Sequence, residues 1–86
     1  MPILAFAKRR EDLDPSLETM GHRMLIQVSD DAQRQIQEML NANKRCCRAE
    51  QVEHLRRIQL TRSYDAEVGL LIEAIERDGE VYCRFL

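Results

Sequence analysis

The side chains best suited to bind a metal ion are the three cysteines and two histidines: Cys46, Cys47, Cys83, His22 and His54. Thiolate and imidazole are ligands that zinc prefers, and four of them make a structural site. Adjacent cysteines, however, lack the two-residue spacing that lets two thiolates converge on one metal. We therefore expect no metal site. The cysteines are instead expected to be free thiols, buried or half-buried in the packing.

Few residues are suited to covalent catalysis. The chain has three serines, Ser16, Ser29 and Ser63, and the last two stand where helices are expected to begin, so we interpret them as caps. Its three glycines are isolated, which leaves no Gly-rich loop to hold a phosphate. The many carboxylates fall on expected helix faces, where solvated charge explains them. The sequence therefore predicts a protein that is not an enzyme and needs no cofactor.

Length and charge limit the class of protein further. With 86 residues, of which 44% are hydrophobic, the chain suffices for one small globular domain. An odd number of cysteines, no secretory signal and no membrane-spanning run predict a soluble cytoplasmic protein. Residues 23–62 hold eight basic and five acidic side chains, whereas residues 63–86 hold two basic and six acidic ones. A basic middle segment of this kind favours a nucleic-acid partner. The charged run at residues 8–12 is expected to be a solvated loop, with a phosphate-contacting arm as the alternative.

Three short runs predict strands, at residues 3–7, 23–28 and 81–86. From Met24 to Val28 every second side chain is apolar, which is the pattern of a strand with one buried face. The residues expected on the buried face of the last strand are Val81, Cys83 and Phe85.

Three periodic segments predict helices near residues 31–42, 48–60 and 65–77, because their apolar residues recur every three or four positions. The stripes comprise Ala32, Ile36, Met39 and Leu40 in the first helix, Ala49, Val52, Leu55 and Ile58 in the second, and Val68, Leu71, Ile72 and Ile75 in the third. The expected ends are Ser29 or Asp30 as the first cap, Ser63 or Asp65 as the third cap, and Gly79 as the third stop. Gly69 inside the third helix predicts a close packing contact.

These elements predict a small α+β domain with one to three short strands and three helices. Along the chain they form an N-terminal strand and linker (residues 1–22), a strand-helix-helix core (residues 23–60) and a C-terminal helix and strand (residues 61–86). Such a short chain often completes its core by dimerising, so we expect a homodimer.

Residues 23–58 resemble the ribbon-helix-helix family of DNA-binding repressors and antitoxins. The resemblance rests on the alternating strand 23–28, the polar helix entry from Ser29 to Asp31, and a second helix that begins near Arg48 with a start similar to the family's. The chain departs from the family pattern in having Cys46-Cys47 where a Ser or Thr cap is usual, and in lacking a glycine in the interhelical turn.

The resemblance implies a dimer in which two copies of the strand pair into a ribbon that fits the major groove of DNA. Arg23 and Gln27 would face base edges, Leu25 a thymine methyl group, and Arg48 a phosphate at the start of the second helix. The implied function is transcription regulation. The alternative is that residues 23–28 form an internal strand with residues 3–7 and 81–86, in which case Arg23 and Gln27 only form its wet face.

A second function is compatible with the same residues. The chain could be an inhibitor or adaptor that binds another protein through its acidic C-terminal helix and strand. Glu67, Glu73, Glu76 and Glu80 would then meet a basic partner.

Overall fold

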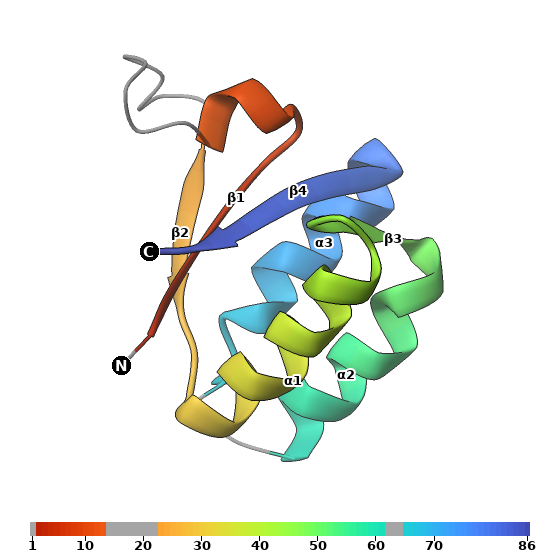
Figure 1. Cartoon of the computed structure of the whole chain (residues 1–86). Helices are drawn as coiled ribbons and strands as arrows, with labels where there is room; N and C mark the ends of the chain where they lie inside the picture. The colour runs from red at the N-terminus through yellow and green to blue at the C-terminus, as the bar shows by residue number, and fades with distance from the viewer. Residues whose placement is uncertain (1, 14–22, 62–64) are drawn as a thin grey trace.

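The computed structural model describes residues 2–13, 23–61 and 65–86 of the chain (Figure 1). Within these ranges the chain forms one α+β domain, with a four-stranded antiparallel sheet and three α-helices. In chain order the elements are β1 (Ile3–Ala7), the 3-10 helix η1 (Arg10–Leu13), β2 (Met24–Gln27), α1 (Asp30–Ala42), β3 (Cys46–Arg48), the 3-10 helix η3 (Ala49–Gln51), α2 (Val52–Thr61), α3 (Val68–Asp78) and β4 (Glu80–Phe85).

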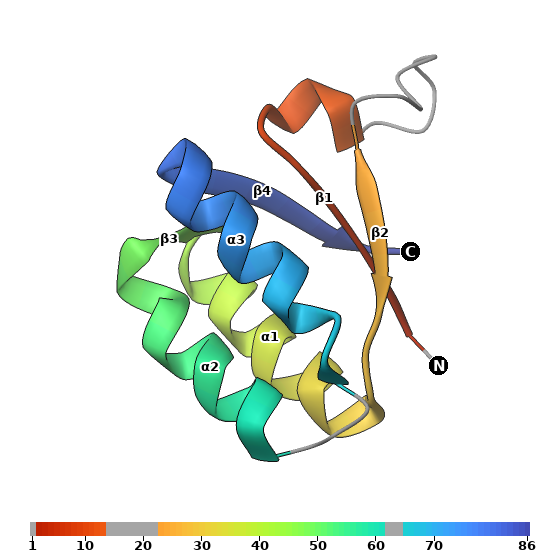
Figure 2. The same ribbon diagram turned by 180° about the vertical axis from the view of Figure 1, so that it is seen from behind.

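The strands lie in the order β2-β1-β4-β3, and each neighbouring pair is antiparallel. β1 is an inner strand, where Leu4 lies opposite Ile26 of β2 on one side and Phe85 of β4 on the other. The three helices cover one face of the sheet, as Figures 1 and 2 show from opposite sides. β2 and β3 are the two edge strands. They precede and follow α1 in the chain but lie on opposite sides of the sheet, with β1 and β4 between them.

Three expectations from the sequence need correction. The sheet has four strands instead of one to three, because residues 46–48 form β3, with Cys47 opposite Val81. The second helix consequently begins with η3 at Ala49 and becomes α-helical at Val52 instead of near residue 48. The alternative that residues 23–28 share a sheet with residues 3–7 and 81–86 is confirmed, but the strand, Met24–Gln27, lies at the edge of this sheet and pairs with β1 only.

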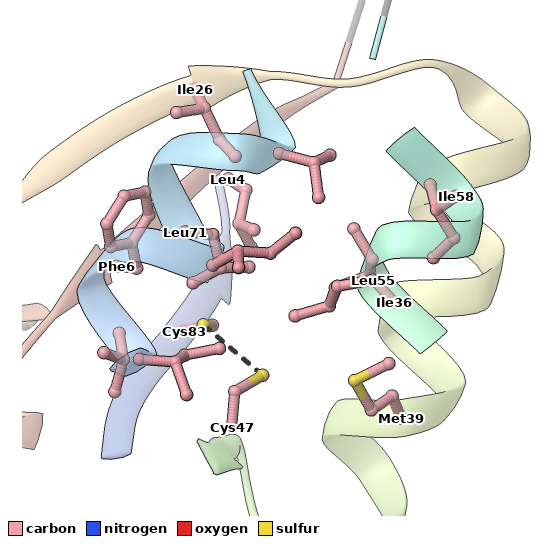
Figure 3. Packing of buried hydrophobic residues seen from close by; sticks show 14 of the residues in the cluster. Leu4, Phe6, Ile26, Ile36, Met39, Cys47, Leu55, Ile58, Leu71 and Cys83 are labelled. Carbon is pink, nitrogen blue, oxygen red and sulfur yellow. Dashed lines mark hydrogen bonds between the residues drawn. The ribbon is translucent and has the colours of Figure 1, made fainter. Parts of the chain in front are cut away.

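The hydrophobic core lies between the sheet and the helices (Figure 3). All four predicted stripe residues of α1 and of α3 are buried there, and so are those of α2 except Ala49, which lies exposed in η3. From the sheet, alternate residues point into the same layer, because successive side chains of a strand face opposite ways. They comprise Leu4, Phe6, Ile26, Cys47, Val81 and Cys83, with Phe85 partly buried against them.

A buried carboxylate joins the starts of two helices. Ser29 is the N-cap of α1, and its hydroxyl oxygen accepts a hydrogen bond from the Ala32 N–H at 3.1 Å. Asp65 is fully buried, and it accepts the Ser29 N–H at 2.8 Å and the Ser29 hydroxyl at 2.9 Å. Asp65 therefore supports the cap of α1 and does not cap α3, which begins at Val68 instead of residue 65. The other predicted cap, Ser63, lies outside the described residues.

Gly69 in α3 makes a close packing contact, as the sequence predicted, and its partner is Gln59. A Cβ atom at this position would lie 2.8 Å from Nε2 of Gln59, which belongs to α2. The absence of a side chain at Gly69 thus leaves room for the Gln59 amide beside α3, although this amide is the end of a flexible side chain that could move aside for a larger residue.

Candidate functional site

The candidate site lies on the face of the sheet that is turned away from the three α-helices. We call it the open face; it is formed by the residues that alternate with the core residues along each strand. Within the described strands these are Ile3, Ala5 and Ala7 of β1, Leu25 and Gln27 of β2, Cys46 and Arg48 of β3, and Glu80, Tyr82 and Arg84 of β4. η1 covers part of it, where Leu13 packs with Ala5, Ala7 and Tyr82.

Beside η1 the open face is hollowed into a depression of about 660 Å³. Its lining contains four basic side chains and one acidic side chain, together with a leucine and a tyrosine. The lining residues are Arg10, Glu11 and Leu13 of η1, Lys44 and Arg45 before β3, and Tyr82 and Arg84 of β4. All four basic side chains are exposed, so an anion in the depression could reach each of them.

Tyr82 forms the aromatic part of this lining. The guanidinium carbon of Arg10 lies 5.1 Å from the centroid of the Tyr82 ring, within the range of a cation–π contact. The ring also packs on the small cluster formed by Ala5, Ala7 and Leu13 and is half-buried. The packing fixes the ring beneath a positive charge and leaves part of it open.

The turn that carries Lys44 and Arg45 has an uncommon backbone. The Cys46 N–H donates to the Asn43 carbonyl at 3.0 Å, and the two central residues, Lys44 and Arg45, have φ of 55° and 64°. Positive φ at both central positions defines a type I′ turn, for which Asn-Gly is preferred. A left-handed conformation costs an ordinary residue roughly 1–2 kcal/mol. Such strain clusters at functional sites, and here it falls on two cations that line the depression.

Charge is divided between the two layers of the molecule. The three α-helices contain seven acidic and four basic residues. The depression on the opposite side of the sheet has the reverse balance, with four basic residues to one acidic residue. A polyanion would therefore be attracted to the open face and repelled by the helical layer.

Three of the four predicted DNA-contacting residues lie on the open face. Leu25 and Gln27 are exposed on β2, and Arg48 is exposed on β3 at the opposite edge, with β1 and β4 between them. Arg23 directly precedes β2 and is half-buried. The structure thus separates Arg48 from the other three by the width of the sheet.

The predicted phosphate position at the start of the second helix already has intramolecular partners. The Arg48 N–H donates to Oε1 of Gln51 at 2.6 Å, and the Arg48 guanidinium donates to Glu80 at 3.2 Å. This hydrogen bond to Glu80 raises the pKa of Arg48.

The four glutamates proposed to meet a basic protein do not form one surface. Glu67 accepts the Gln27 N–H at 2.6 Å, Glu76 pairs with Arg56 at 3.2 Å, and Glu80 pairs with Arg48 across β3 and β4. Glu80 lies on the sheet, and Glu73 is exposed on α3.

The cysteines are packed as thiols. Sγ of Cys83 lies 3.9 Å from Sγ of Cys47 in the core, where the hydrogen bond to Cys47 and burial raise the pKa of Cys83 (Figure 3). Burial, followed by the Glu80 carboxylate, raises the pKa of Cys46 on the other face of β3. Among the described residues no group of three or more His, Cys, Asp or Glu side chains could hold a metal ion. His54 is exposed on α2, and His22 lies outside the described residues.

Sequence reasoning missed Lys44, Arg45, Tyr82 and Arg84 as site residues. One signal was present: the alternation that buries Val81 and Cys83 also places Tyr82 and Arg84 together on the opposite face. Arg10 belongs to the run expected to be a solvated loop, with a phosphate-contacting arm as the alternative, and it lies in η1 on the open face.

The chain matches no protein-family model, no curated protein and no solved structure. In the part of the chain that the structure describes, no helix is long and apolar enough to cross a membrane.

Proposed function

We propose that this protein binds DNA, without catalysis, through the open face of its sheet. The observation that carries the proposal is the depression in which Arg10, Lys44, Arg45 and Arg84 gather around Tyr82 from three separate segments of the chain. Phosphate contacts of this kind supply nearly all of a protein's non-specific affinity for DNA, and they position the protein on the nucleic acid.

Residues beyond the depression would extend the contact. Leu25, Ala5 and Arg84 lie opposite one another across three neighbouring strands, which places Leu25 about 10 Å from the depression's Arg84. A DNA strand held at the depression could therefore also touch Leu25 and Gln27 on β2. This retains two of the base-contacting residues expected from the sequence, in a different arrangement.

A ribbon made of two β2 strands has less support than the open face. β2 already pairs with β1, and only its outer edge could pair with a second copy. On that edge the Gln27 N–H donates to Glu67, so a second strand would have to displace this carboxylate. The homodimer stays a prediction, which light scattering after size exclusion would check.

Binding to a basic protein is also less well supported. Three of the four glutamates expected to carry it have intramolecular partners, and they are divided between the helical layer and the sheet. A partner protein would have to break these contacts before it could use the carboxylates.

Arg84→Ala is expected to weaken DNA binding about tenfold near 0.1 M salt, because one phosphate contact changes log K by about 0.9 for each decade of salt. The slope of log K against log salt should also fall by about one ion. Fluorescence anisotropy with a labelled oligonucleotide, titrated between about 50 and 200 mM salt, measures both.

The matched control is Arg34→Ala, which removes the same charge from α1 on the helical layer, where Arg34 pairs with Asp31. It should leave both affinity and slope nearly unchanged. Equal losses in the two variants would mean that only net charge matters, and the open face would not be the binding surface. No salt-dependent binding of the unmodified protein would refute the proposal itself.

A further inference from the structure

The width of the sheet limits which form of DNA it can bind. Neighbouring strands lie about 4.8 Å apart, so the outer strands of four are separated by about 14 Å before their side chains are counted. The major groove of duplex DNA is about 12 Å wide and admits a helix or a two-stranded ribbon. The four-stranded sheet is too wide to enter it, and the depression lies on the face of the inner strand β4.

The shape of the depression also favours an unpaired strand over a duplex. The bases of a duplex are stacked on each other, so their flat faces cannot contact a side chain. A hollow of about 660 Å³ with part of a tyrosine ring in its lining could receive phosphate and sugar atoms of a duplex but not the flat face of a base. An unpaired strand can turn a base into such a hollow and stack it on the ring.

The charges around the ring suit the phosphates on either side of one base. Lys44 and Arg45 approach the depression from the turn before β3, Arg84 lies two residues beyond Tyr82 on β4, and Arg10 lies over the ring. Basic side chains surrounding an aromatic ring are the usual combination of surfaces that bind single strands.

We propose that the depression binds single-stranded DNA, with one unpaired base replacing the Arg10 guanidinium on the Tyr82 ring and its neighbouring phosphates held by Arg10, Lys44, Arg45 and Arg84. This inference rests on the proposed function, since it names the form of DNA that the open face takes.

The test compares three ligands: an oligothymidine, an abasic strand of equal length and an adenine-thymine duplex of that length. Each is titrated with the unmodified protein and with two Tyr82 variants. The oligothymidine should bind at least tenfold more tightly than the duplex or the abasic strand. Tyr82→Phe keeps the ring and should bind within about twofold. Tyr82→Leu keeps an apolar side chain against Leu13 and Ala7 but should lose about 5- to 150-fold, the usual contribution of one stacked base.

Three readouts separate stacking from a general structural effect. Tyr82→Leu should leave the salt slope and the affinity for the abasic strand unchanged, because it removes no charge. Since the chain has two tyrosines and no tryptophan, a Tyr64→Phe background makes Tyr82 the sole tyrosine, and oligothymidine should quench its emission. The abasic strand should not quench it.

The outcomes distinguish the two proposals. Equal or tighter binding of the duplex, or equal binding of the abasic strand, would overturn the stacking inference and leave DNA binding by the open face intact. A loss in Tyr82→Leu that is the same for every ligand would overturn the inference too. Absence of binding to all three ligands would overturn both proposals.

Discussion

Replacing Asp65 by alanine is expected to lower the free energy of unfolding by about 2–4 kcal/mol, a large part of the stability of so small a domain. The carboxylate is fully buried and accepts both the backbone N–H and the hydroxyl of Ser29. Its removal leaves two buried donors without their acceptor, and such groups cost about 1–3 kcal/mol each when unsatisfied. Urea denaturation followed by circular dichroism measures the loss.

Two variants test whether the loss comes from this contact. Glu73→Ala removes an exposed carboxylate from α3 and should change stability by no more than about 0.5 kcal/mol. In a double-mutant cycle, Ser29→Ala and Asp65→Ala should be non-additive, because each removes part of the same hydrogen-bonded pair. Additive losses, or a loss below about 1 kcal/mol for Asp65→Ala, would show that Asp65 does not hold the start of α1.

The sequence predicted the elements whose signals are local. Each helix stripe recurs within one segment, so α1 and α3 could be placed with nearly all their buried residues, and α3 ends at the expected Gly79. β3 could not be found in this way. Its three residues are too few to alternate, and they are a strand only because they pair with residues 80–82 of β4. The alternation of β4 predicts a strand there, but nothing in the sequence of residues 46–48 shows that they pair with it.

Most residues of the candidate site were missed for the same reason, because they come together only through contacts between segments that are distant in the sequence. Leu25, Gln27 and Arg48 were identified from patterns within one stretch of chain, but the depression is assembled from η1, the turn before β3, and β4. Charge counted along the chain gave a basic middle segment, whereas the fold divides charge by layer. Arg84 comes from the acidic C-terminal segment, and it joins Lys44 and Arg45 only because β4 lies between β1 and β3.

The turn at Lys44 and Arg45 should separate stability from function. Replacing the pair by Asn-Gly is expected to raise the free energy of unfolding by about 1–2 kcal/mol, because these residues accept positive φ at both central positions. The same change removes two cations from the depression. DNA binding should then fall about 25- to 60-fold near 0.1 M salt, the effect of two lost phosphate contacts on a single strand or a duplex.

Lys44→Ala with Arg45→Ala is the matched control, because it removes the same two charges and keeps the strain. It should weaken binding as much as the Asn-Gly pair but bring no gain in stability, since alanine is no better suited than lysine or arginine to positive φ. Urea denaturation and DNA anisotropy on the two double variants provide the comparison. If Asn-Gly stabilised the protein without weakening binding, Lys44 and Arg45 would not contact DNA. If the Asn-Gly variant and the double-alanine variant had the same free energy of unfolding, the turn would not be strained. The expected combination, a stabler protein that binds worse, would mean that the unfavourable backbone is retained because it places two cations beside Tyr82.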